Sequence, residues 1–212
     1  MIAMNRLCTL LKKRTPLGNR LILLVLITVI TACSPVKTTI SNQYLLSTFS
    51  AIPSPTASHK TIFVTPPEAM SGYQSEQMMY INKPFELSTF AHNAWVSPPA
   101  EMLLPLLVQS LQASRYFFAV ASGVNANDTD FRLDTQLIAL HQSFLTQPST
   151  LFFTAKVIMT RVSDTHVLAS QVVHLQIPCP SDTPYGGVQA ANKAMILFTK
   201  DATSFAIKAS NK

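Results

Sequence analysis

Three long stretches in the C-terminal half alternate between apolar and polar residues, and this pattern constrains the fold most strongly. They cover residues 131–139, 151–160 and 167–177. A period of two with one polar face predicts antiparallel strands that are covered on one side and wet on the other. The predicted covered face carries Phe131, Leu133, Leu137 and Ala139, then Leu151, Phe153, Ala155, Val157 and Met159, then Val167, Ala169, Val173, Leu175 and Ile177.

A first helix is predicted ahead of these strands. Ser97 is the expected N-cap, and Pro98 suits the first helical position. Pro105 falls inside the helix, where it should remove one hydrogen bond and kink the chain. One apolar stripe is formed by Leu104, Leu107, Val108 and Leu111.

A second helix is predicted at the C-terminal end of the chain. Thr183 and Pro184 supply its cap and first-turn signals. Its apolar residues recur at spacings of three and four, at Val188, Ala191, Met195, Phe198, Ala202 and Phe205.

These elements predict a single α+β domain over residues 43–212. Its sheet is expected to be curved and mainly antiparallel, or mixed, with two helices packed on one face. Shorter strands are expected at residues 44–46, 62–64, 77–81, 86–90 and 117–121.

The pattern of the N-terminal region predicts a lipoprotein signal peptide over residues 1–32. Basic residues precede an apolar stretch, and Thr31-Ala32 leads directly into Cys33. The stretch of 12 residues from Leu21 to Ala32 is short for a membrane span, which needs about 20 residues. We therefore expect cleavage before Cys33, acylation of its thiol as the anchor to a membrane, and a tether over residues 33–42. Ser34, rather than Asp, after this cysteine favours the outer membrane, with the domain facing the periplasm.

Charge and cysteine content exclude some classes of function. Residues 1–32 hold five of the 16 lysines and arginines and no acid, so eleven bases remain against ten acids. This near-neutral balance argues against a nucleic-acid partner. Once Cys33 is acylated, Cys179 is alone in the mature domain, so no intrachain disulfide is expected.

No motif nominates a catalytic, metal-binding or cofactor-binding residue, so we expect a non-enzymatic protein whose one attached group is the lipid on Cys33. The five histidines lack the spacing of a zinc site, and there is no nucleophile elbow or phosphate-binding loop. The lone tryptophan, Trp95, stands just before Pro98 at the start of the first helix. Two interpretations remain open: a packing role at the helix entry, or an aromatic anchor at a subunit interface formed by Trp95 and Pro98.

The order of these features resembles a known family. The stretch Ile30-Thr31-Ala32-Cys33 resembles a lipobox, the motif that ends a lipoprotein signal peptide at the acylated cysteine. It is followed in order by Tyr44-Leu45-Leu46, by Ile62-Phe63-Val64, by Trp95-Val96-Ser97-Pro98-Pro99 at the start of a Leu-rich helix, and by Phe131-Arg132-Leu133-Asp134. This pattern is similar to the ABC-type transport auxiliary lipoproteins. The resemblance implies a non-enzymatic accessory subunit of an intermembrane lipid transporter. Its expected partner is a protein with a mammalian-cell-entry (MCE) domain, and several copies of the subunit could assemble as a homo-oligomeric ring.

Two other hypotheses remain. The first is a structural or assembly lipoprotein of another envelope machine, such as a pilotin-like factor or a lipopolysaccharide-export helper. The second is a small lipid carrier or an enzyme with an apolar cavity, to which Phe152 and Phe153 give faint support.

Overall fold

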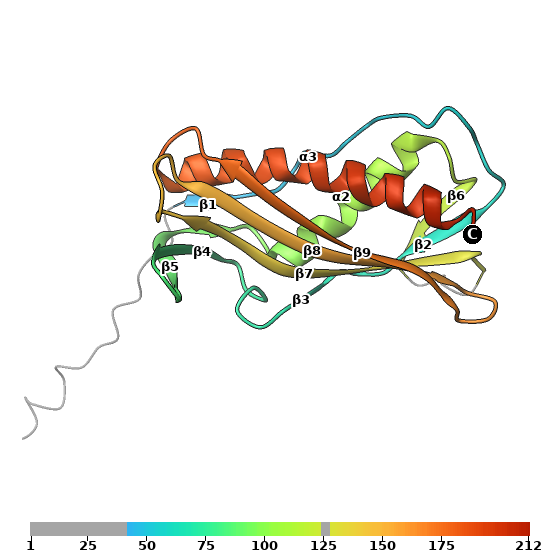
Figure 1. Ribbon diagram of the computed structural model, residues 1–212, viewed down its shortest axis with the longest axis horizontal. Coiled ribbons are helices and arrows are strands. Elements are labelled where there is room, and N and C mark those ends of the chain that lie inside the picture. The colour runs from blue at the N-terminus through green and yellow to red at the C-terminus, as the bar shows by residue number, and fades with distance from the viewer. Residues whose placement is uncertain (1–41, 124–127) are drawn as a thin grey trace, which may run out of the picture. The chain divides into compact units, whose positions relative to one another are not determined.

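A three-stranded antiparallel meander forms the main part of the sheet (Figure 1). The computed structural model describes residues 42–123 and 128–212. Strands β7 (Phe131–Ser143), β8 (Thr150–Arg161) and β9 (Val167–Pro178) pair in sequence order, each antiparallel to its neighbour. The predicted meander is therefore confirmed, and every apolar residue expected on the covered face of β8 is buried. On β9 the prediction holds for Val173 and Ile177, whereas Ala169 and Leu175 are only half-buried. Val167 is exposed, because the register of β8 and β9 shifts just before it pairs with Thr160.

The other edge of β7 carries three short strands that run parallel to it. They are β2 (Thr61–Val64), β3 (Glu68–Ala69) and β4 (Gln77–Lys83). Residues 61–83 therefore follow β7 along its length, and Pro66-Pro67 separates β2 from β3 because proline lacks the N–H that a ladder needs.

Three further strands complete the nine that the described residues form. Strand β5 (Glu86–Trp95) is antiparallel to β4, β1 (Asn42–Tyr44) is parallel to β5, and β6 (Ala119–Ser122) is parallel to β2. The sheet is therefore mixed, with its longest ladders antiparallel.

A β-bulge in β7 corrects the predicted position of Ala139. Leu137 pairs with Ala155, but Ala139 pairs with Thr154, so Ile138 is an extra residue on β7. The bulge reverses which residues point into the core. As a result Leu140, not Ala139, is buried beside Phe153.

Helix α3 (Pro184–Ala209) lies along the inner face of β7, β8 and β9, and its predicted start and apolar stripe are confirmed (Figure 1). Thr183 is the N-cap, and its hydroxyl accepts a hydrogen bond from the Gly186 amide at 3.1 Å. All six residues of the stripe are buried, and the Phe198 ring packs 4.9 Å from the Phe153 ring. This contact joins helix and sheet in the middle of the core.

Helix α2 (Pro99–Ser114) packs against α3 and against β2 and β6. The predicted cap was wrong by one residue: Pro98 occupies the N-cap position, and no side chain caps the helix. Since Pro98 has an extended backbone with ψ of 131°, helical geometry begins only at Pro99. The helix continues through Pro105, which is exposed. Proline has no N–H to donate to the carbonyl four residues earlier, and water can reach that carbonyl instead.

The buried stripe of α2 also differs from the prediction. Leu107 and Leu111 are buried as expected, whereas Leu104 and Val108 are only half-buried. The face turned to the core is instead completed by Met102, Leu103, Leu106, Ser110 and Ser114.

The ends of the short strands lie a few residues from their predicted positions. β1 ends at Tyr44, where the prediction began, and Leu46 is a buried residue beyond it. Similarly, Phe117 packs into the core ahead of β6. In both places tertiary packing, not strand pairing, accounts for the apolar residues.

Polar side chains of α3 hold the segment that follows β1. Asn192 Oδ1 accepts a hydrogen bond from the Ser47 amide at 2.9 Å, and Thr199 Oγ1 accepts one from the Ser50 amide at 2.8 Å. Asn192 Nδ2 also donates to the Leu45 carbonyl. These hydrogen bonds supply partners for backbone amide and carbonyl groups in a segment that is not paired with any strand.

Candidate partner-binding surface

The sequence nominated three site residues, of which the structure describes two, Trp95 at the end of β5 and Pro98 just before α2. Cys33 lies outside the described residues, so its acylation stays a prediction. Trp95 is 3% exposed and belongs to the core, which is the packing role. Pro98 is half-buried at the N-cap of α2. An interface role for Trp95 and Pro98 stays a prediction, with Pro98 the more accessible of the two.

The space beside Trp95 bears on the lipid-carrier hypothesis. A cavity of ≈ 10 Å³ is bordered by Trp95, Met78, Phe90 and Leu140. A void of this size holds about one water molecule and no acyl chain. The cavity therefore offers no support for a carrier.

The outer face of the sheet, opposite α3, carries a polar groove of ≈ 650 Å³ where residues 65–68 run beside β7. This outer-face groove is lined by Thr65, Pro66, Pro67, Glu68, Asp134, Thr135, Gln136, Lys156 and Ile158. Gln136 and Lys156 are cross-strand partners, so both project from the same face.

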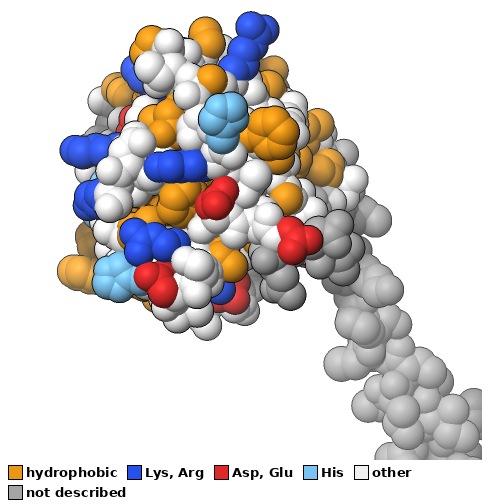
Figure 2. All heavy atoms as spheres, turned by 90° about the vertical axis from the view of Figure 1, so that its right-hand side faces the viewer, with side chains coloured by type: hydrophobic (Ala, Val, Ile, Leu, Met, Phe, Trp, Pro, Cys, Tyr) orange, Lys and Arg blue, Asp and Glu red, His pale blue; other side chains and the backbone are white. Residues whose placement is uncertain are grey.

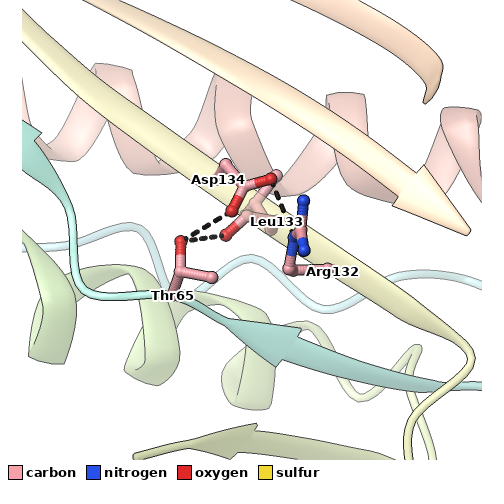
Figure 3. Close-up of polar contacts among 4 residues, drawn as sticks. All are labelled: Thr65, Arg132, Leu133 and Asp134. Carbon is pink, nitrogen blue, oxygen red and sulfur yellow. Dashed lines mark hydrogen bonds and ion pairs between the residues drawn. The ribbon is translucent and has the colours of Figure 1, made fainter. Parts of the chain in front are cut away.

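Hydrogen bonds hold Asp134 at the end of this groove (Figure 3). Its Oδ1 is 3.0 Å from Thr65 Oγ1, and its Oδ2 is 3.0 Å from Arg132 Nε. The Thr65 amide donates to the Leu133 carbonyl at 3.1 Å, which continues the parallel pairing of β2 and β7. The Arg132–Asp134 pair is partly exposed to solvent and contributes little to stability, so both charges can be reached by a binding partner.

A stack of three rings lies further along the outer face. The His141 ring is 5.5 Å from the Phe152 ring and 6.3 Å from the Tyr73 ring. Tyr73 Oη and His141 Nδ1 are 3.0 Å apart. Burial lowers the pKa of His141 and raises the pKa of Tyr73, so both are neutral at pH 7. The outer face is thus partly aromatic, which its alternating polar residues did not predict.

One end of the domain is rich in basic side chains (Figure 2). A depression of ≈ 560 Å³ there is lined by Lys60, Arg161 and Lys212 together with Asp130. Lys60 Nζ donates to the Ser210 carbonyl and lies 5.6 Å from the centre of the Phe131 ring. Hydrogen bonds from the amide and hydroxyl of Thr61 lower the pKa of Asp130. Asp130 therefore stays charged and offsets part of the basic charge.

Two further observations concern metal binding and thiol reactivity in the described ranges. Across residues 42–123 and 128–212, no three His, Cys, Asp or Glu side chains are grouped so as to hold a metal ion. Cys179 is buried, and burial raises the pKa of its thiol, which disfavours the reactive thiolate. In the same part of the chain, no helix is both long and apolar enough to span a bilayer.

The fold defines a class of α+β domain seen in solved structures. XCC0632 from Xanthomonas campestris superimposes with a TM-score of 0.72 at 19% identity, over 80% of this chain and 96% of that one. An uncharacterised protein superimposes with a TM-score of 0.63 at 14% identity, over 79% and 97% of the two chains. At these identities the likeness establishes the fold. No curated protein matches the sequence significantly.

The sequence itself identifies the family. The model of the ABC-type transport auxiliary lipoprotein component matches residues 44–202. The chain therefore belongs to this family, and the resemblance noted from its motifs is confirmed. The match runs from the end of β1 to the last turns of α3, so it covers nearly all of the described domain.

Proposed function

We propose that this chain is a non-enzymatic accessory subunit of an envelope lipid transporter. In this proposal, acylated Cys33 anchors it to the outer membrane, and the domain faces the periplasm and docks an MCE-domain protein of the ABC system. The observation that carries the proposal is the family match over residues 44–202. The absence of a nominated nucleophile in the sequence and the mature chain's near-neutral charge agree with a docking role.

The outer-face groove is the surface that best suits a protein partner. Helices cover the other face of β7, β8 and β9, so this face is the one open to a large ligand (Figure 1). It offers charges of both signs, at the exposed Arg132 and the half-buried Asp134 and Lys156, and further along it the half-buried rings of Tyr73 and Phe152. Aromatic contacts near a polar rim are characteristic of protein interfaces.

Partner identity is tested by site-specific photo-crosslinking in the native envelope. A photoreactive residue replaces Gln136 in the groove or, as a matched control, Gln189 on the exposed side of α3. We expect the Gln136 position to capture an MCE-domain protein, with its permease and ATPase co-purifying, and the Gln189 position to capture none. Capture of secretion or lipopolysaccharide-export components would reject the proposal in favour of another envelope machine.

Anchoring is tested separately by metabolic labelling with a fatty-acid analogue and by membrane fractionation. The wild-type chain should carry the label and fractionate with the outer membrane, whereas Cys33→Ser should lose both. Label that persists in Cys33→Ser would contradict the assignment of this cysteine. An inner-membrane location of the labelled protein would reject only the sorting inference from Ser34.

A further inference from the structure

Phe85 is exposed in a way that the fold alone does not explain. It occupies the tip of the β4–β5 hairpin, where Lys83 pairs with Glu86, and its side chain is fully exposed to solvent. Its φ of 66° places it in the left-handed region, which glycine and asparagine adopt easily and bulky residues avoid. A large apolar ring in this position strains the backbone and gains no burial within the domain in return, so we look for a contact outside the chain.

Other exposed apolar side chains lie at the same end of the domain. In Figure 1 the β4–β5 turn, the β7–β8 connection, β1 and the first turn of α3 are all at the left-hand end. The Phe144 amide bonds the Ile81 carbonyl at 2.8 Å, and the Tyr44 ring is 6.0 Å from the Tyr185 ring. We call this the tether-end surface, defined by Leu45, Phe85, Leu87, Val96, Leu145 and Tyr185, which are each at least 40% exposed.

The length of the tether limits which end of the domain can meet the membrane. Nine residue steps separate Cys33 from Asn42, the first residue of β1, and they span at most about 30 Å. The 26 residues of α3 alone extend about 39 Å towards the basic end. An acylated Cys33 therefore keeps the tether-end surface near the bilayer, while the depression lined by Lys60, Arg161 and the C-terminal Lys212 lies at the other end, where Figure 1 marks the C-terminus.

We propose that the tether-end surface rests on the phospholipid bilayer, with the Phe85 ring inserted at the boundary between headgroups and acyl chains. Tyr185 suits the same interface because its ring is apolar and its hydroxyl is polar. This inference rests on the proposed anchoring at Cys33 and deepens it, because it assigns the orientation of the anchored domain. The basic end and the outer-face groove are then left free for partners.

The test uses the full lipidated protein in phosphatidylethanolamine–phosphatidylglycerol vesicles whose acyl chains carry bromine. A bimane label is attached at Phe85→Cys or, as a matched control, at Phe118→Cys, which is 75% exposed beside β6. Cys179 is buried and so protected from the label. We expect the brominated lipid to quench the label at position 85 and to leave the label at position 118 unchanged.

The outcomes separate the orientation from the anchoring. Vesicle flotation with an unquenched label at position 85 overturns the orientation, whether that end faces solvent or a protein. Failure to float with vesicles overturns the anchoring proposal and this inference with it. A second measurement uses Phe85→Gly, which should unfold at the same or a higher urea concentration than wild type. A clear loss of stability would give Phe85 a structural role and contradict our argument.

Discussion

At the scale of single residues, the contact between Phe153 and Phe198 is central to the core. Both rings are almost fully buried. Phe198→Ala removes a large side chain where the surrounding sheet and helix cannot collapse, so we expect a loss of about 3–5 kcal/mol in the free energy of unfolding. Phe118→Ala, at an exposed position, should change it by less than about 0.5 kcal/mol. Urea titration of both variants measures the difference, and equal effects would contradict the assigned core.

His141 predicts how stability depends on pH. Burial lowers its pKa below the ordinary 6.5, so the unfolded chain binds a proton more readily than the folded one. Stability should therefore fall as the pH drops through 6.5 towards the lower folded pKa. The pKa values of Asp130 and Asp182 are also lowered, but these carboxylates change the free energy of unfolding only below about pH 4, where they become protonated in the unfolded chain.

This pH dependence is checked by measuring urea midpoints between pH 7.5 and pH 5. His141→Phe preserves the stacking with Phe152 and removes the titrating group, so its midpoint should vary less over this range. An unchanged slope in His141→Phe would show that another group is responsible.

At the scale of elements, the two helix starts form a natural comparison. Thr183 caps α3 through a side-chain hydrogen bond, whereas no side chain caps α2. Thr183→Ala should cost about 1 kcal/mol of stability, and Ser97→Ala, at the cap that the sequence wrongly predicted, should cost much less. Denaturant unfolding of the two alanine variants gives the comparison, and a larger loss in Ser97→Ala would contradict the cap assignments.

The first turn of α3 depends on a close backbone approach. A Cβ added at Gly186 would lie 2.1 Å from the Ser181 carbonyl oxygen, a backbone atom that cannot swing away. Glycine to alanine in a helix ordinarily gains about 1 kcal/mol. Here we expect Gly186→Ala to lose about 1–3 kcal/mol, because the loop before α3 must shift. A gain in the thermal midpoint would show that this loop yields easily.

Periodicity predicted the long elements well because each buries one continuous face. Strand β8 and helix α3 follow their apolar patterns residue by residue. The bulge at Ile138 was not predictable, because one extra residue leaves no local signature. The parallel strands β2 and β3 also escaped full prediction, since what pairs them is the distant strand β7 and not a turn nearby.

The candidate surface was even less accessible to sequence reasoning. Cys33 carries a local motif, so it was nominated, although it lies outside the described residues. The outer-face groove instead combines Thr65, Asp134 and Lys156, which come from three separate segments. Likewise, the ring stack depends on the distance of His141 from Tyr73 and Phe152 in the fold. Such a site becomes visible only when the sheet register is known.

At the scale of the whole molecule, one continuous core predicts cooperative unfolding. The buried residues of α2, α3 and the sheet form a single cluster that includes Trp95. The lone tryptophan therefore reports on the same transition as the helices. Trp95 fluorescence and far-ultraviolet circular dichroism should change at the same urea concentration. A fluorescence change at lower urea would instead indicate that the β1–β5 region opens first.

The position of β1 at the edge of the sheet has a mechanical consequence. Under the anchoring that we propose at Cys33, any tension in residues 33–41 enters the domain at Asn42. Hydrogen bonds between strands run across the strand axis, so a pull along β1 loads its bonds to β5 together, whereas a pull across it breaks them one at a time. After β1 in the chain, the hydrogen bonds from the Ser47 and Ser50 amides to side chains of α3 form a second point of attachment. The domain is thus built to resist drag parallel to β1 and to peel when it is lifted sideways.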